Sequence, residues 1–216
     1  MENIVSYLTA FGLATGAGTK ATIPVIALGL FHHTPYFELS PQWAWLASPP
    51  VLAVLIVMLL VELYADSHPE LGAWGDSAGY LPAIVSGFIA FAASTGKIDS
   101  SLVQLAASGV LGGGTAALVK GVRNMVRRPF RDHVESAHHH IGTAATAGEA
   151  AFSGAVSTAA FVAPLAGGIL AAVAIVSALA IGVFSRSGKT ACPNCGAKID
   201  PRAIVCASCR GEVPRR

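Results

Sequence analysis

The four cysteines of the chain form two Cys-x-x-Cys pairs near its C-terminus. Cys192 and Cys195 make the first pair, and Cys206 and Cys209 make the second after ten intervening residues. Each pair holds two thiolates about one metal ion apart, and four thiolates can close a tetrahedral zinc site with Zn–S bonds of about 2.3 Å. Since four cysteines leave no position open for a substrate, the motif predicts a structural zinc ion rather than a catalytic one.

The segment around these cysteines is too short to bury a hydrophobic core, so metal binding would supply most of its folding free energy. Gly196 and Gly211 follow the two pairs and are expected to form the tight turns of two zinc knuckles. A pair of disulfides is the alternative, which a cytoplasmic location would disfavour. We therefore predict a zinc ribbon at 192–213, which a linker at 185–191 joins to the rest of the chain.

A second group of candidate functional residues, which are ionisable, lies inside or beside long apolar segments. Lys20 follows a glycine-rich stretch, and Glu149 lies in a run of small residues. Glu62 and Asp66 are four residues apart and so share a helix face. A charge at the centre of a bilayer costs roughly 2.5–3.5 kcal/mol on insertion scales, so such residues usually pair or line a pathway. The predicted solute or ion pathway comprises Lys20, Glu62, Asp66, Glu149, Gly16, Gly18, Gly112 and Gly114.

Each of these charged residues also has a purely structural interpretation. Lys20 could form an ion pair with either glutamate, and Glu149 could form an interhelical hydrogen bond. Glu62 and Asp66 could form an acid pair that contacts water at the membrane interface. Lys120, near the end of an apolar segment, is expected to snorkel towards water.

Basic residues and histidines gather after the fourth apolar segment. We expect the arginines to bind anionic headgroups of the lipid bilayer, because each basic residue is worth about 1 kcal/mol near the membrane surface. Nucleic acid is a disfavoured partner, since this stretch does not interleave its basic residues with aromatic ones. The headgroup-binding residues are Arg123, Arg127, Arg128 and Arg131. The polar run at 132–140, which includes His133, Glu135, His138, His139 and His140, could bind a metal or sense pH, or form a solvated loop.

The composition shows what must position these residues. Of the 216 residues, 53% are apolar and 12% are charged, whereas a soluble domain carries roughly 25% charged residues. This composition excludes a disordered chain, disfavours a soluble enzyme and predicts an all-α polytopic membrane protein. Residues 1–185 carry a net charge of −3 and residues 186–216 carry +5, so a basic, cysteine-bearing tail follows an apolar body.

The apolar runs predict about six transmembrane helices within a domain at 1–184, since a helix needs about 20 mostly apolar residues to cross a bilayer. Five runs lie at about 4–31, 50–65, 80–95, 101–122 and 159–184. A sixth at 141–158 is weaker and could instead be a re-entrant or interfacial helix. No Lys or Arg precedes the first run, so we expect a retained span rather than a cleaved signal peptide.

Lys and Arg in short loops predict the orientation of these spans. The arginine-rich loop and the residues after the last run should both be cytoplasmic, which requires an even number of crossings between them. Six spans then place both termini in the cytoplasm of a cell whose inner (plasma) membrane holds the protein. The first loop would face outward, with an interfacial belt of Tyr36, Phe37, Trp43 and Trp45.

The two halves of the body, at about 1–96 and 100–184, share one order of features. In each half a glycine-rich break precedes a glutamate and then a helix led by proline, Pro82 or Pro164. Halves with three spans must run in opposite directions, so the pattern predicts a 3+3 inverted repeat of the kind found in secondary transporters. A helix break frees backbone groups that must face protein or water. The alternative is that the glycines only allow close helix packing.

Two resemblances support this organisation. The tail resembles the short zinc ribbons appended to many bacterial membrane proteins. The body resembles a bacterial family of multi-pass membrane proteins described as a domain of unknown function, and this implies a membrane topology but no known activity. The matching elements are the glycine-rich first run ending in Ile23-Pro24, the stretch LVELYADSHP at 60–69, Trp74 with Asp76, Pro82 with Gly87, and the glycine-rich fourth run.

Two functions fit these observations. The first is a small transporter or channel for an ion or small solute, with the zinc ribbon as a cytoplasmic regulatory or interaction module. The second is a membrane scaffold without transport activity, whose ribbon recruits a cytoplasmic protein partner. A homo-oligomer is compatible with both. We do not expect an enzyme, because the chain has no His-Glu-x-x-His, Gly-x-Ser-x-Gly or phosphate-loop motif.

Overall fold

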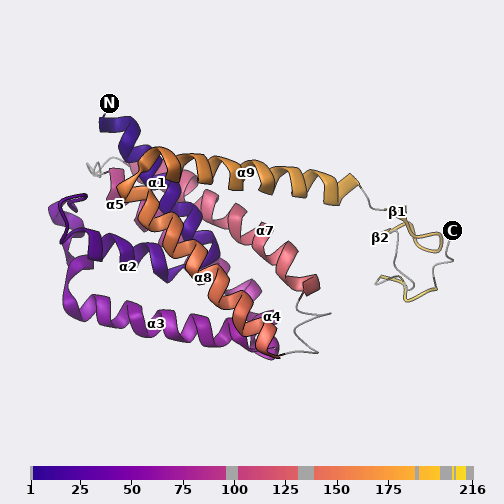
Figure 1. The fold of residues 1–216 in the computed structure, drawn as a ribbon. Coiled ribbons are helices and arrows are strands. Elements are labelled where there is room, and N and C mark those ends of the chain that lie inside the picture. Colours follow the sequence, from indigo (N-terminus) through magenta and orange to yellow (C-terminus); the bar gives the residue numbers. More distant parts are fainter. Residues whose placement is uncertain are drawn as a thin grey trace. The chain divides into compact units, whose positions relative to one another are not determined.

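The computed structural model describes residues 2–95, 102–130, 139–187, 190–199, 206 and 208–212 (Figure 1). The chain divides into two compact units, Met1–Ile175 and Val176–Arg216, and each is described by itself. The helical elements are α1 (Glu2–Thr19), α2 (Thr22–Phe31), η1 (Pro41–Ala47), α3 (Pro49–Ser67), α4 (Pro69–Ala78), α5 (Tyr80–Thr95), α6 (Leu102–Ser108), the π-helical η2 (Gly109–Gly113), α7 (Gly114–Phe130), α8 (His139–Val162) and α9 (Pro164–Ser187). The predicted all-α body is therefore confirmed.

Prolines set several of the helix starts. Pro49, Pro69 and Pro164 each begin a helix, where the missing N–H group of proline leaves no hydrogen bond unmade. The first glycine-rich stretch ends in the predicted break, between α1 and α2. At the second stretch the predicted break is wrong, because the helix continues from α6 into α7 through the π-helical turn η2.

The first apolar run forms a helical hairpin, α1–α2, rather than one continuous span. The Thr9 hydroxyl of α1 donates to the carbonyl oxygen of Ala160 at 2.9 Å, and the Phe31 ring at the end of α2 stacks on Phe161 with centroids 4.4 Å apart. Both open ends of the hairpin therefore lie at the same end of α8, and Figure 1 shows α2 running back from the turn.

This hairpin corrects the expected topology of residues 4–31. Because the chain reverses at Lys20–Ala21, the start of α1 and the loop after α2 lie on the same side of the hairpin. The structure thus does not place the N-terminus and the first loop on opposite sides, as a single crossing would.

Three helices in the described part of the chain are long and apolar enough to cross a membrane. They cover Pro49–Ser67, Gly75–Thr95 and Leu105–Arg128, and shorter apolar helices cover Thr22–Phe31 and Pro164–Ser177. The weak run at 141–158 lies inside the continuous helix α8. On α3 the side chains of Val54, Val57, Leu60 and Val61 are all exposed, which in a membrane would place them against lipid.

Glycines allow the helices of the body to approach closely. A Cβ atom added at Gly18 of α1 would lie 2.5 Å from Val119 Cβ of α7, and one at Gly112 would lie 2.3 Å from the carbonyl oxygen of Gly87 in α5. One at Gly16 would meet the Ser157 hydroxyl of α8 at 2.8 Å. These contacts are those of small residues at helix interfaces in membranes.

Candidate functional sites

Five charged side chains meet at the turn of the α1–α2 hairpin, and we call them the ion cluster. Its members come from four separate segments and are Lys20 (hairpin turn), Asp66 (α3), Arg123 and Arg127 (α7) and Glu149 (α8). Lys20 is fully buried, with 0% of its side chain exposed. The cluster unites residues that are up to 129 positions apart in the sequence, from Lys20 to Glu149.

Each of the two carboxylates of the ion cluster forms ion pairs with more than one cation. Asp66 Oδ2 pairs with the Lys20 ammonium and accepts from Arg123 Nη2 at 2.6 Å. Glu149 Oε2 accepts from the same Arg123 nitrogen at 2.7 Å and lies 3.6 Å from Lys20 Nζ, while its Oε1 lies 2.8 Å from Arg127 Nη1. This sharing offsets the desolvation of charges that are individually costly to bury.

Arg127 also fastens the helices through their backbone. Its Nη2 donates to the carbonyl oxygens of Asp66 and Gly142, each at 3.3 Å, and to the Thr146 hydroxyl at 2.9 Å. The Thr146 hydroxyl donates in turn to the Asp66 carbonyl oxygen at 3.2 Å. The end of α3, α7 and the first half of α8 are thus joined by one polar network.

Glu62 lies one turn before Asp66 on α3 and binds the start of α2. Its Oε1 accepts from the Ala21 backbone N–H at 2.9 Å, and its Oε2 accepts from the N–H and the hydroxyl of Thr22. A carboxylate at a helix N-terminus satisfies orphan donors and is favoured by the helix dipole. The Ser86 hydroxyl of α5 donates to the Ala21 carbonyl oxygen on the other side of the break. The backbone groups freed at the turn are therefore bound by neighbouring helices, as the sequence predicts.

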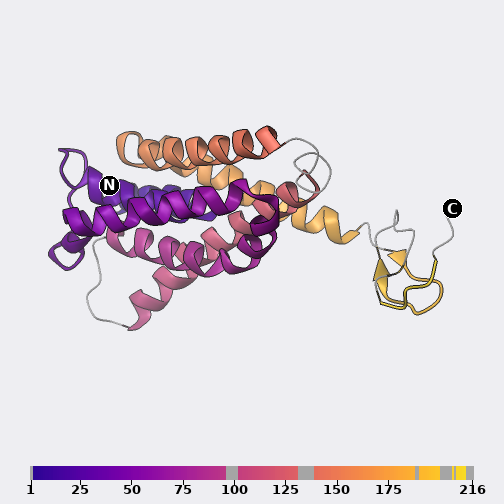
Figure 2. The same cartoon turned by 90° about the horizontal axis from the view of Figure 1, so that it is seen from below.

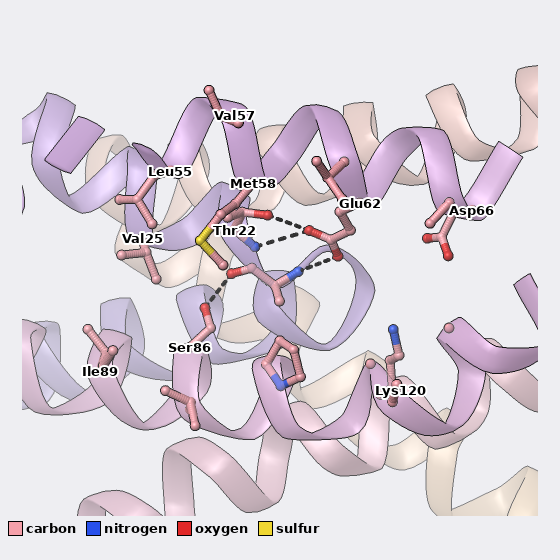
Figure 3. Close-up of a pocket in the computed structure, with 18 of the residues that line it drawn as sticks. Thr22, Val25, Leu55, Val57, Met58, Glu62, Asp66, Ser86, Ile89 and Lys120 are labelled. Atoms are coloured by element: carbon pink, nitrogen blue, oxygen red, sulfur yellow. Dashed lines mark hydrogen bonds between the residues drawn. The ribbon is translucent and has the colours of Figure 1, made fainter. Parts of the chain in front are cut away.

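A cavity of about 590 Å³ opens beside Glu62 between α2, α3 and α5 (Figure 3). Most of its wall is apolar, with Val25, Leu55, Met58 and Ile89 among the lining residues. Its charged groups, Glu62, Asp66 and Lys120, lie towards one end, and Thr22 and Ser86 line its middle (Figure 3).

The structure brings most of the predicted pathway residues close together, although Glu62 lies beside the ion cluster and not within it. Lys20, Asp66 and Glu149 meet in the ion cluster, and Glu62 lies next to it. Gly16, Gly18 and Gly112 contact neighbouring helices, whereas a Cβ at Gly114 would meet open space.

The structure separates the arginines that we expected at lipid headgroups. Arg123 and Arg127 are buried and pair with the carboxylates inside the body, which their i, i+4 spacing on one face of α7 permits. Arg128 has 57% of its side chain exposed and binds Asp76 at 3.1 Å. Arg131, His133, Glu135 and His138 lie outside the described residues, and only the backbone of His139 and His140 is described, at the start of α8.

The four cysteines form the second site, with all four sulfur atoms within 4.8 Å of one another. The Sγ atoms of Cys192 and Cys209 are 3.8 Å apart, and those of Cys195 and Cys206 are 3.6 Å apart. A tetrahedron with Zn–S bonds of about 2.3 Å has S···S edges of about 3.8 Å, whereas a disulfide needs about 2.05 Å. The backbone N–H groups of Cys209 and Ser208 hold the pKa of the Cys206 thiol below its usual range, which favours the thiolate that a metal requires.

The two knuckles share one backbone pattern but differ in the residue that turns. The strands β1 (Thr190–Ala191) and β2 (Lys198–Ile199) pair antiparallel around the first knuckle, where Gly196 has φ +72° and donates to the Cys192 carbonyl oxygen. In the second knuckle Arg210, with φ +56°, makes the equivalent bond to Cys206. The expectation that Gly211 makes this turn is wrong.

The small size of Gly211 has a different reason. A Cβ atom there would lie 2.5 Å from Asn194 Nδ2 of the first knuckle. Glycine is therefore favoured at 211 by close approach to the Asn194 side chain, whereas at 196 it is favoured by the backbone angle.

Comparison with known families assigns both parts of the chain. Residues 7–184 match the family described as Domain of unknown function (DUF4126). The chain belongs to this family. Residues 188–210 match a zinc-ribbon domain, so the DUF4126 body carries a ribbon with four cysteines suited to structural zinc. No curated protein and no solved structure matches the chain. Together with the three apolar helices, the family match identifies a DUF4126 membrane protein.

Sequence reasoning selected Lys20, Asp66 and Glu149 of the ion cluster but assigned Arg123 and Arg127 to lipid headgroups. The signal for Arg123 and Arg127 was present, because Lys120, Arg123 and Arg127 recur at i, i+3 and i+7 on one face of α7. A strip of cations on a helix that is otherwise apolar can face either headgroups or buried carboxylates, and only the packing of α3 and α8 decides between them.

Proposed function

We propose that this DUF4126 protein is a small transporter or channel for an ion or small solute, with its zinc ribbon as a cytoplasmic regulatory or interaction module. The observation that supports this most is the α1–α2 turn. A helix is broken beside buried charges, and the broken end lies next to a cavity. Broken helices whose ends hold solutes near the middle of the membrane are the usual binding sites of secondary transporters.

Glu62 would link the cavity to the helix break in this function. The same carboxylate lines the cavity and binds the first N–H groups of α2. A solute that changed the charge or hydrogen bonds of Glu62 would therefore change how firmly α2 is held. The ion cluster, one turn further along α3, would stay as the fixed support of the turn.

The proposed topology replaces the first crossing by the hairpin and keeps the other five crossings, which are α3, α5, α6–α7, α8 and α9. The first half then crosses the membrane twice, so the span count no longer requires the two halves to be inverted. The hairpin would enter and leave from one face of the plasma membrane, and the zinc ribbon would lie in the cytoplasm. Arg128 and Arg131 remain candidates for anionic headgroups on that side.

Flux across reconstituted liposomes tests the proposal. We expect wild-type vesicles to pass at least one member of a panel of small cations, anions and protons faster than empty vesicles. Glu62→Gln should lower that flux at least tenfold, whereas Glu38→Gln, the same change on an exposed residue, should leave it unchanged. Wild-type flux equal to that of empty vesicles for the whole panel would contradict transport.

The alternative function is a scaffold whose ribbon recruits a cytoplasmic protein. The shared pairing in the ion cluster favours it, because a static scaffold needs buried charges that are fixed in place. This function predicts no flux, and it predicts that loss of zinc abolishes capture of the partner while the DUF4126 body stays folded.

A further inference from the structure

We infer that the cavity between α2, α3 and α5 binds a single-chain amphiphile with a carboxylate head, a fatty-acid anion, and that Lys120 binds the carboxylate. This inference goes beyond the proposed transport, because such a site would exist in a scaffold as well. Four observations carry it: the size and polarity of the cavity, the condition of Lys120, the local charge balance and the position of the opening.

The cavity has the size and polarity that such a ligand requires. Its volume of about 590 Å³ falls within the range of about 300–1,000 Å³ that is typical of small-molecule sites. Apolar side chains such as Val25, Leu55 and Ile89 form most of the wall, while the charged groups lie at one end. An acyl chain can therefore contact the wall while its head reaches Lys120 (Figure 3).

Lys120 is the cation that lines that end of the cavity. Only 4% of it is exposed, and no residue in the described part of the chain makes a hydrogen bond or ion pair with its ammonium. Figure 3 shows this ammonium pointing towards the space beside Glu62 and Asp66. The absence of a side chain at Gly79 leaves room for it, since a Cβ atom there would lie 2.7 Å from Lys120 Nζ.

The nearby carboxylates are already engaged, which explains why Lys120 is unpaired. Glu62 binds the start of α2, and Asp66 binds Lys20 and Arg123. Asp66 and Glu62 attract the Lys120 ammonium without forming an ion pair with it, so an anion entering the cavity would add a charge-assisted hydrogen bond. The expected snorkelling of Lys120 towards water is not what the structure shows.

The charge balance selects a monoanion. The ion cluster together with Glu62 and Lys120 contains four cations and three carboxylates, which leaves one positive charge in excess. One carboxylate would neutralise it. A phosphate head with two charges would lie beside Glu62 and Asp66 with an excess of negative charge, and like charges close together are unfavourable.

The opening of the cavity favours entry from the bilayer. Met58 and Val61 of α3 line the cavity, and 63% of Val61 is exposed on the apolar outer face. In a membrane this face contacts acyl chains. A fatty acid dissolved in the bilayer can thus enter sideways, which a water-soluble anion cannot do.

Tryptophan quenching in nanodiscs of a neutral phospholipid tests the inference on the full chain. Trp45 lines the cavity and becomes the only reporter after Trp43→Phe and Trp74→Phe. Because half of Trp45 is exposed, dibromostearic acid dissolved in the lipid will quench it linearly, and only a saturable component reports the site. We expect saturable quenching by the acid and none by the brominated alcohol of the same length.

Variants at Lys120 distinguish binding in the cavity from partitioning of the fatty acid into the lipid. Lys120→Met should weaken saturable binding at least tenfold, Lys120→Arg should stay within about threefold, and the control Lys189→Met, in the linker to the ribbon, should match the parent. Met58→Trp, read by displacement of radiolabelled oleate, should block the cavity while Lys120 remains. The inference is overturned if Lys120→Met binds as the parent does, if the alcohol binds as tightly as the acid, or if an alkyl phosphate binds more tightly than the carboxylate. If Lys120→Met does not fold, Lys120→Arg and Met58→Trp decide by the same criteria.

Discussion

The ion cluster and the zinc ribbon each hold several charged or ionisable groups close together, but they compensate these charges in different ways. In the ion cluster three cations and two carboxylates from distant helices neutralise one another within the fold. In the ribbon four thiols of one short segment converge with no opposing charge of their own. The cluster is therefore stable only if the helices are assembled, whereas the ribbon is stable only if an ion is supplied. The first is a product of tertiary structure and the second of local sequence.

Removal of zinc should give the largest effect and should be confined to the ribbon. Structural zinc contributes about 10–16 kcal/mol in small zinc units at neutral pH, so Cys206→Ser or a strong chelator should unfold the ribbon. The helical signal and the thermal transition of the DUF4126 body should stay as they are. Zinc content by atomic emission together with hydrogen exchange of the two units would measure this.

The control for that experiment is Ser208→Ala, which removes a hydroxyl within the second knuckle and keeps all four ligands. It should retain one zinc per chain. A ratio far below one in the wild-type protein, or a loss of body structure on chelation, would contradict the independence of the two sites.

Asp66→Asn should give the next largest effect, which is a loss of stability of the DUF4126 body. Lys20 and Arg123 would both lose a carboxylate, and removing one partner of a buried ion pair costs about 3–5 kcal/mol. We expect a lower unfolding temperature in detergent with unchanged zinc content. Glu38→Gln, on an exposed side chain, should change stability by less than about 0.5 kcal/mol. Equal stability of both variants would mean that the cluster does not hold the helices.

Glu62→Gln should destabilise the body by less than Asp66→Asn does. Gln keeps one acceptor for the start of α2 but loses the charge that favours a helix N-terminus, and such caps are worth about 0.5–2 kcal/mol. Hydrogen exchange at Ala21 and Thr22 should rise more than exchange in α5. An even rise across both helices would place the effect elsewhere than at the cap.

The difference between the two sites also explains what the sequence could and could not predict. The ribbon depends on the spacing of Cys192, Cys195, Cys206 and Cys209, which is visible in the sequence. The break after the first glycine-rich stretch and the π-turn at the second follow from local propensity in the same way. The direction of the chain after Lys20 does not, because a turn and a kink have the same glycine signal. That direction is set by Glu62, which arrives from a helix some forty residues later and binds the new N-terminus.

The same reasoning applies to the arginines of α7. Their spacing placed Arg123 and Arg127 on one helix face, but the choice between headgroups and buried carboxylates depends on where Asp66 and Glu149 pack. Lys120 lies on that face as well, and the missing side chain at Gly79, on a separate helix-flanking segment, leaves room for its ammonium.

The smallest effects should come from substitutions in the turns of the knuckles. These substitutions distinguish two reasons for a glycine, the backbone angle and a close side-chain contact. Arg210 has φ +56°, a conformation that costs a residue with a side chain about 1 kcal/mol. Arg210→Gly should therefore tighten zinc binding by about fivefold in competition with a chelator. Gly196→Ala should weaken it by a similar factor, because Gly196 has φ +72°.

Gly211→Ala should also weaken zinc binding, but through contact with Asn194 rather than through backbone strain. Adding Asn194→Ala removes the atom that the new Cβ would meet, so it should restore binding to Gly211→Ala. It should not rescue Gly196→Ala, whose penalty lies in the backbone angle and has no side-chain partner within 4 Å. Rescue of both variants, or of neither, would show that the two knuckles do not differ in the way that their geometry indicates.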